Sequence, residues 1–155
     1  MDYPINYKDI TNETEFYSEL DLLYDKAETY IKSFKWCKEI KDCSLYTNLG
    51  KIFCIFLFNI DNTASREDNF LWIVVGDIPS MYLDIFGAKT TRAVVETYTV
   101  LAEDWIDKIK KSKSVAKCYP FDAEPTLELA ELLEKKVSFM KTTLIDNIDD
   151  IILTA

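Results

Sequence analysis

The sequence predicts an α+β domain in which an N-terminal helix precedes a small antiparallel sheet and two C-terminal helices. Three observations support this fold class. A stretch with helical apolar spacing comes first, apolar runs separated by short polar turns follow, and two further stretches of helical spacing close the chain. Neither a composition shift nor an internal repeat divides residues 1–155, so we expect one domain. Helices packed on one face of the sheet would give two layers.

The first helix is expected over about residues 13–34. Asn12 followed three residues later by Glu15 is typical of a capping box at a helix start. Apolar residues then recur at steps of three and four, which places them on one face. These residues are Phe16, Leu20, Leu23, Ala27, Ile31 and Phe34.

About four strands are expected to form an antiparallel meander, because only short connections separate them. The segment 51–60 is almost continuously apolar, which is typical of a central strand covered on much of both faces. In chain order, the expected strands are 43–49, 51–60, 69–76 and a weaker one at 80–86.

Two helices are expected after the sheet. Thr90 or Thr91 is a suitable cap for the first of them, and Pro125 is placed to open the second at its first turn. Both helices carry an apolar stripe that would pack on the sheet. The stripes are Val94, Tyr98, Leu101, Trp105 and Ile109, and then Ala130, Leu133, Val137, Met140, Leu144 and Ile148.

Charge and composition exclude several functions. The chain has 27 acidic and 18 basic residues, a formal net charge of −9, and no basic cluster with interleaved aromatic residues, so we expect no nucleic-acid partner. Any partner selected by charge should be a basic protein. No apolar run approaches the roughly 20 residues of a membrane span, and residues 1–16 lack the pattern of a secretory signal. The expected location is the cytoplasm, with reduced cysteines.

The residue inventory also limits catalysis. The chain has no histidine, which excludes Ser-His-Asp and Cys-His nucleophile systems and mixed Cys/His zinc sites. No glycine-rich phosphate-binding motif occurs. We therefore expect no cofactor, no metal and no catalytic residues. Paired carboxylates acting with Mg²⁺ are the enzymatic alternative, against the simpler interpretation that acidic neighbours form a solvated surface.

Two segments are candidate partner-binding surfaces. The first is the turn after the strand 69–76 and the run beyond it, with Asp77, Tyr82 and Asp84. Asp77 also has a structural interpretation, because an Asp between Gly and Pro suits an Asx turn. Tyr82 follows an irregular corner, and tyrosine is favoured at protein interfaces.

The second candidate surface is the connector before the last helix. Tyr119 and Phe121 stand there beside Asp122 and Glu124. A surface that is both acidic and aromatic suits an Arg- or Lys-rich partner. We expect this connector to be exposed.

The segments "FLWIVVGDIPSMYL" (70–83), "AEDWIDKI" (102–109) and "YPFDAEPTLELAELL" (119–133) together resemble a family of small, uncharacterised bacterial proteins. Its hallmark is a W-x-V-V-G-D-x-P-x-x-Y strand-turn segment followed by two helices. The resemblance covers about 65 residues closely and implies no catalytic residue, because the family has no assigned activity. In general character such proteins are similar to bacterial immunity proteins, which are small, acidic and α+β.

Three functional hypotheses follow from the sequence. The first is a non-enzymatic protein-binding domain, most specifically an immunity-type inhibitor that neutralises a basic toxin through the acidic and aromatic surface. The second is an accessory protein whose last amphipathic helix docks on a second copy, giving a homodimer. The third is a carboxylate- and Mg²⁺-dependent enzyme.

Overall fold

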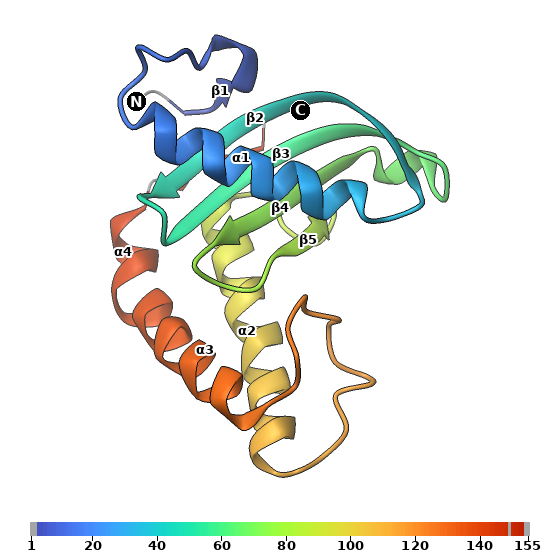
Figure 1. Cartoon of the computed structure of the whole chain (residues 1–155), viewed down its shortest axis with the longest axis vertical. Coiled ribbons are helices and arrows are strands. Elements are labelled where there is room, and N and C mark those ends of the chain that lie inside the picture. Colours follow the sequence, from blue (N-terminus) through green and yellow to red (C-terminus); the bar gives the residue numbers. More distant parts are fainter. Residues whose placement is uncertain (1–2, 149, 154–155) are drawn as a thin grey trace.

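The structure is a computed structural model that describes residues 3–148 and 150–153. A five-stranded antiparallel sheet lies between one helix on one face and two helices on the other (Figure 1). In chain order the main elements are β1 (Ile5–Asn6), α1 (Tyr17–Lys32), β2 (Cys37–Leu49), β3 (Phe53–Asn62), β4 (Phe70–Gly76), β5 (Met81–Asp84), α2 (Thr91–Lys110), α3 (Leu127–Phe139) and α4 (Ile145–Asn147). Short 3-10 turns occupy Tyr7–Asp9 and Arg66–Asp68, and a π-helical turn at Met140–Leu144 joins α3 to α4.

The α+β class and the antiparallel meander are confirmed, but the sheet has one strand more than expected. The strand order is β1-β2-β3-β4-β5, with every neighbour antiparallel. The additional strand, β1, is two residues long and pairs with Ser44 and Leu45. Strand β2 begins at Cys37 rather than at about residue 43, because its polar first half pairs with the end of β3.

The expectation that all helices share one face of the sheet is wrong. Alternate residues of β3 point to opposite faces, and both sets are apolar. Cys54, Phe56 and Phe58 pack in a core with α1, whereas Phe53, Ile55 and Leu57 pack in a second core with α2 and α3. The two C-terminal helices do share one face, but α1 covers the other, so the domain has three layers (Figure 1).

The helix starts agree with the sequence only in part. The Thr90 hydroxyl accepts a hydrogen bond from the Ala93 amide, which confirms this cap of α2. Thr126, rather than Pro125, caps α3, by accepting from the Leu129 amide. Helix α1 begins later than expected, and the prediction of a capping box at Asn12 is wrong. The N-cap of α1 is Phe16, which has a left-handed backbone conformation and forms no side-chain capping bond.

The two expected apolar stripes contribute eight buried residues to the core on the α2 and α3 face. Trp105 and Tyr98 are buried on α2, and Trp72 of β4 is buried in the same core. The stripe of α3 remains buried into the π-helical turn, where Met140 and Leu144 still contact the core. These helices therefore hold the end of β4 and the corner that follows it.

Candidate functional site at the corner between β4 and β5

The corner begins at Gly76, which only glycine can occupy. Its φ of +148° is one that other residues rarely adopt, and a Cβ atom there would lie 2.2 Å from the backbone oxygen of Ile52. This close approach lets the Asp77 amide donate to the same Ile52 oxygen at 3.0 Å. The Lys26 ammonium donates to the Gly76 oxygen at 2.6 Å. The corner thus joins the start of β3, the end of β4 and helix α1.

Helices α2 and α3 hold the other side of the corner. The buried Tyr98 hydroxyl donates to the Pro79 oxygen at 2.8 Å, and Ile78 is buried. The Asp77 carboxylate is exposed and forms an ion pair with Lys136 of α3. The hydrogen bond from Lys136 lowers the pKa of this carboxyl. Side chains of α1 and α2 therefore fix the backbone of the corner, and α3 adds an exposed ion pair.

The Asx turn expected at Asp77 lies at Asp84 instead. One Asp84 oxygen accepts hydrogen bonds from the Phe86 and Gly87 amides at 2.9 and 2.8 Å. Within the described part of the chain, the hydrogen-bond donor to the Asp77 carboxylate is Lys136. Asp84 is thus a turn residue at the far end of β5, apart from the corner.

Three adjoining cavities surround the corner and share residues at their borders. The central cavity, of about 360 Å³, lies between Asp77, Pro79, Asp122 and three leucines of α3. Towards α3 it continues into a second cavity of about 360 Å³, which Ile52 and Leu132 line. Towards α1 it continues into a third of about 620 Å³, which we call the α1 cavity. The corner is therefore the centre of a continuous concave surface.

The structure brings together residues from both surfaces expected from the sequence. Asp77 and Asp122 line the same central cavity, although 45 positions separate them (122 minus 77). The Tyr119 hydroxyl accepts from the Tyr82 amide and donates to the Tyr82 oxygen, each at 2.9 Å. Burial raises the pKa of Tyr119. Tyr119 thereby bonds the backbone N–H and C=O of Tyr82 on the outer edge of β5, where another strand could otherwise pair.

Other expected site residues lie elsewhere. Phe121 is 7% exposed and packs between Tyr98 and Trp105, so the expectation that it is exposed is wrong. Tyr82 is half-buried in an aromatic cluster under α1, and Glu124 is exposed but lines none of the three cavities. In the connector, the aromatic side chains of Tyr119 and Phe121 point inward, because large aromatic side chains contribute strongly to a buried core.

Sequence reasoning missed the apolar side chains that line the corner. Leu129 and Leu132 of α3 are 37% and 47% exposed, and both line the central cavity. Ile52, 44% exposed, lines the cavity towards α3. The sequence did contain a signal for these residues. Leu129 and Leu132 each precede a position of the buried stripe by one residue, so they lie beside the core-facing side of the helix and not on it.

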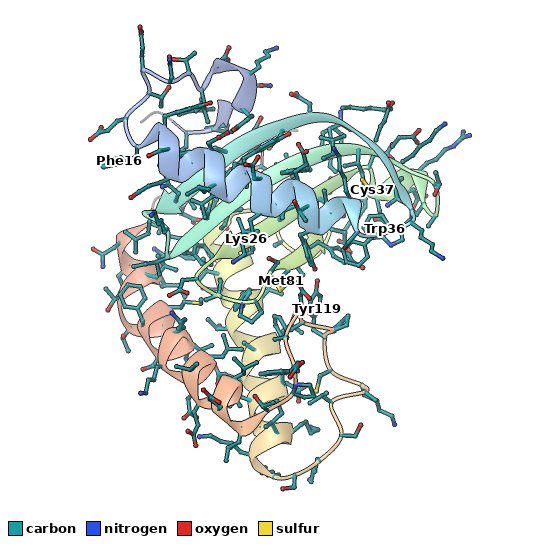
Figure 2. The ribbon with its side chains drawn as sticks, viewed as in Figure 1. Phe16, Lys26, Trp36, Cys37, Met81 and Tyr119 are labelled. Carbon is teal, nitrogen blue, oxygen red and sulfur yellow. The ribbon has the colours of Figure 1, made fainter. Side chains whose placement is uncertain are left out.

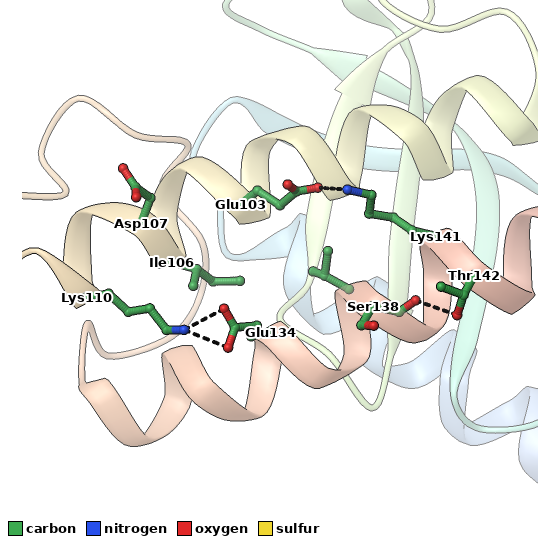
Figure 3. A pocket seen from close by; sticks show the side chains of 9 residues that line it. Glu103, Ile106, Asp107, Lys110, Glu134, Ser138, Lys141 and Thr142 are labelled. Carbon is green, nitrogen blue, oxygen red and sulfur yellow. Dashed lines mark hydrogen bonds and ion pairs between the residues drawn. The ribbon is translucent and has the colours of Figure 1, made fainter.

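A separate groove lies between α2 and α3, and we call it the helix groove (Figure 3). Its volume is about 480 Å³. Two ion pairs cross it, Lys110 to Glu134 at 2.6 Å and Lys141 to Glu103 at 3.1 Å. Charges in this groove are therefore matched within the domain.

The described residues carry neither a metal-binding cluster nor a membrane-spanning helix. In residues 3–148 and 150–153 there is no group of three or more Cys, Asp or Glu side chains placed to hold a metal ion. Over the same residues, no helix has the length and apolar character needed to cross a membrane. No protein-family model, curated protein or solved structure matches this chain. The geometry of the corner and the charge of the chain therefore carry the functional argument.

Proposed function

We propose that this chain is a non-enzymatic protein-binding domain, of the immunity type, that neutralises a basic partner protein through the corner. One observation carries the proposal. Exposed leucines of α3 and the carboxylates of Asp77 and Asp122 line one concave surface. An apolar centre with a charged rim is the usual anatomy of a protein interface.

The charge of the chain selects the kind of partner. A net charge of −9 attracts a basic protein and accelerates its association. A protein that attacks nucleic acid needs a basic surface around its cleft, so an acidic domain seated there would block it. This is how an inhibitor without catalytic residues would neutralise a toxin.

A second copy of the chain is the other candidate occupant. Leu127 of α3 is 54% exposed, so this helix offers apolar surface that a homodimer would also use. Two copies that each carry −9 repel one another, however, and this repulsion favours a basic partner. Light scattering at micromolar concentration separates these two proposals, because the homodimer would have twice the mass of the monomer.

The test compares Leu132→Lys with Val100→Lys in cells that naturally produce the protein. Both residues are exposed on helices, at 47% and 66%, but Val100 lines none of the three corner cavities. Tagged proteins are purified and their bound partners quantified by mass spectrometry. We expect a basic partner that Leu132→Lys loses by about tenfold or more, as for a residue in the centre of an interface. The Val100→Lys protein should retain it.

Two results would contradict the proposal. One is a stoichiometric partner that both variants retain equally, which would place the interface elsewhere. The other is a partner without a basic surface, which would remove the charge argument. If the purified partner is an enzyme, its activity should fall to zero at one equivalent of the wild-type protein.

A further inference from the structure

The α1 cavity combines aromatic walls with carboxylates. Tyr30 of α1 and Phe34, which follows the end of that helix, line one side, and Phe121 and Asp122 of the connector line the other. Asp25 of α1 is a further lining residue. In Figure 2, Tyr119 of the connector lies just below Met81 of β5, and Lys26 of α1 lies above both. The cavity thus lies between two elements far apart in sequence.

Two residues that line the cavity, Tyr30 and Phe34, belong to a cluster of five aromatic rings. The ring of Tyr82 lies 5.1 Å from that of Phe34, 5.3 Å from that of Trp36 and 6.2 Å from that of Tyr119, measured between centroids. Tyr30 completes the cluster at 6.4 Å from Tyr82. Mutual packing holds these rings in place, and the electron-rich faces of such rings attract cations.

The two carboxylates have no cationic partner in the described part of the chain. Asp25 and Asp122 are exposed, and neither forms an ion pair with a described lysine or arginine. Lys26 also lines the cavity, but its ammonium donates to the Gly76 oxygen at the corner. Burial chiefly raises the pKa of Tyr30, its neighbours Tyr119 and Tyr82 raise it further, and the charge of Asp122 makes a smaller addition.

From these contacts we propose that the α1 cavity receives an arginine side chain of the basic partner, with its guanidinium stacked on the aromatic wall and paired with Asp25 and Asp122. This inference rests on the proposed function and names the chemistry recognised beside the leucines. Arginine suits the cavity better than lysine because its planar guanidinium stacks on rings and forms paired hydrogen bonds with carboxylates. A volume of about 620 Å³ lies within the range of small-ligand sites.

The test uses a model compound, so that it does not depend on finding the partner. N-acetyl-L-arginine methylamide is titrated into ¹⁵N-labelled protein, and N-acetyl-L-citrulline methylamide is the neutral control of the same shape. We expect saturable amide shifts at residues around the cavity, with a millimolar dissociation constant for the arginine compound. The dissociation constant for the citrulline compound should be about tenfold larger. The double variant Asp25→Asn, Asp122→Asn should lose this difference.

A matched variant controls for nonspecific charge effects. Glu67→Gln with Asp68→Asn removes the same charge from an exposed turn that does not line the cavity, and it should bind arginine as the wild type does. Absent shifts, equal shifts with citrulline, or equal binding by the Asp25 and Asp122 variant would each overturn the inference. Failure of this inference can be distinguished from failure of the proposed function. The interface is tested with Leu132→Lys, at a residue that does not line the α1 cavity.

Discussion

The corner and the helix groove are both concave and both carry charge, but they are built in different ways. Side chains of Lys26, Tyr98 and Tyr119 bond to backbone atoms at or next to the corner. The helix groove is crossed by side-chain ion pairs between α2 and α3. Backbone bonds fix the shape of the corner, whereas exposed ion pairs add little rigidity.

The difference also concerns the charges that remain for a partner. In the helix groove, Glu103 and Glu134 are paired with lysines of the facing helix (Figure 3). Around the corner, Asp25 and Asp122 form no ion pair with the described lysines and arginines. A carboxylate that is unpaired within its own domain can pair with another protein without first losing an internal ion pair. The comparison therefore favours the corner over the helix groove as the binding surface for the proposed partner.

The largest expected effect concerns the backbone of the corner. Gly76→Ala should destabilise the protein by about 3 kcal/mol or more, because both the glycine-only conformation and the contact with Ile52 must be relieved. Urea unfolding followed by tryptophan fluorescence measures the free energy of unfolding. Partner capture should fall with it, because the cavities depend on this turn.

Gly50 is the matched control, in the turn between β2 and β3. Its φ is +51°, but a Cβ atom there would meet nothing within 4 Å. Gly50→Ala should therefore cost only about 1 kcal/mol, the penalty of a left-handed residue. Equal losses for the two variants would show that the close approach at Gly76 does not hold the corner.

The second effect concerns the connector. Tyr119→Phe removes the hydroxyl that bonds both the amide and the oxygen of Tyr82. We expect a loss of about 1–3 kcal/mol, because two polar groups of the β5 edge lose a part-buried partner. Hydrogen exchange of the Tyr82 amide should accelerate more than the global change in stability requires.

Tyr7→Phe is the control for this substitution. The Tyr7 hydroxyl donates one hydrogen bond, to Asp21 near the surface at 2.7 Å, away from the corner. Because the acceptor is a carboxylate, loss of this bond should cost about 1–3 kcal/mol, but exchange of the Tyr82 amide should accelerate no more than the global change in stability requires. If both tyrosine variants behaved alike, the connector would not be fastened to the sheet in the way described.

The sequence predicted most elements because their apolar patterns are long. The stripe from Ala130 to Leu144 and the apolar runs of β3 and β4 needed no tertiary information. Elements without such a pattern were missed. Strand β1 consists of two residues that are extended only because Ser44 and Leu45 pair with them, and the polar first half of β2 depends on its pairing with β3.

The site was harder to predict because residues far apart in the sequence form it only in the tertiary structure. Asp77 and Asp122 were both named from the sequence, but no local pattern indicates that they line one cavity. The prediction of which sheet face each helix covers failed for a related reason. When both alternating sets of a strand are apolar, as in β3, the pattern shows that two faces are covered but not which helix covers each. Phe121 was misjudged because its neighbours are polar, although its ring is in the core.

The smallest expected effect concerns the ion pair at the corner. Because Lys136 lowers the pKa of Asp77, the pair stabilises the folded state fully above the ordinary carboxyl pKa of about 4 and loses this contribution as the pH falls through the lowered value. Asp77 is exposed, so solvent screening keeps the contribution below about 1 kcal/mol. Asp77→Asn should therefore be slightly less stable than the wild type at pH 7, and the difference should vanish in strong acid.

A double-mutant cycle with Lys136→Met isolates this ion pair, and a cycle with Glu134→Gln and Lys110→Met does so for the helix groove. Both coupling energies should be below about 1 kcal/mol at pH 7, as for other exposed pairs. A coupling above about 2 kcal/mol at Asp77 would mean that the corner depends on its surface charge for stability. Asp77 would then be committed to Lys136, and a basic partner would have to break that pair before it could use this carboxylate.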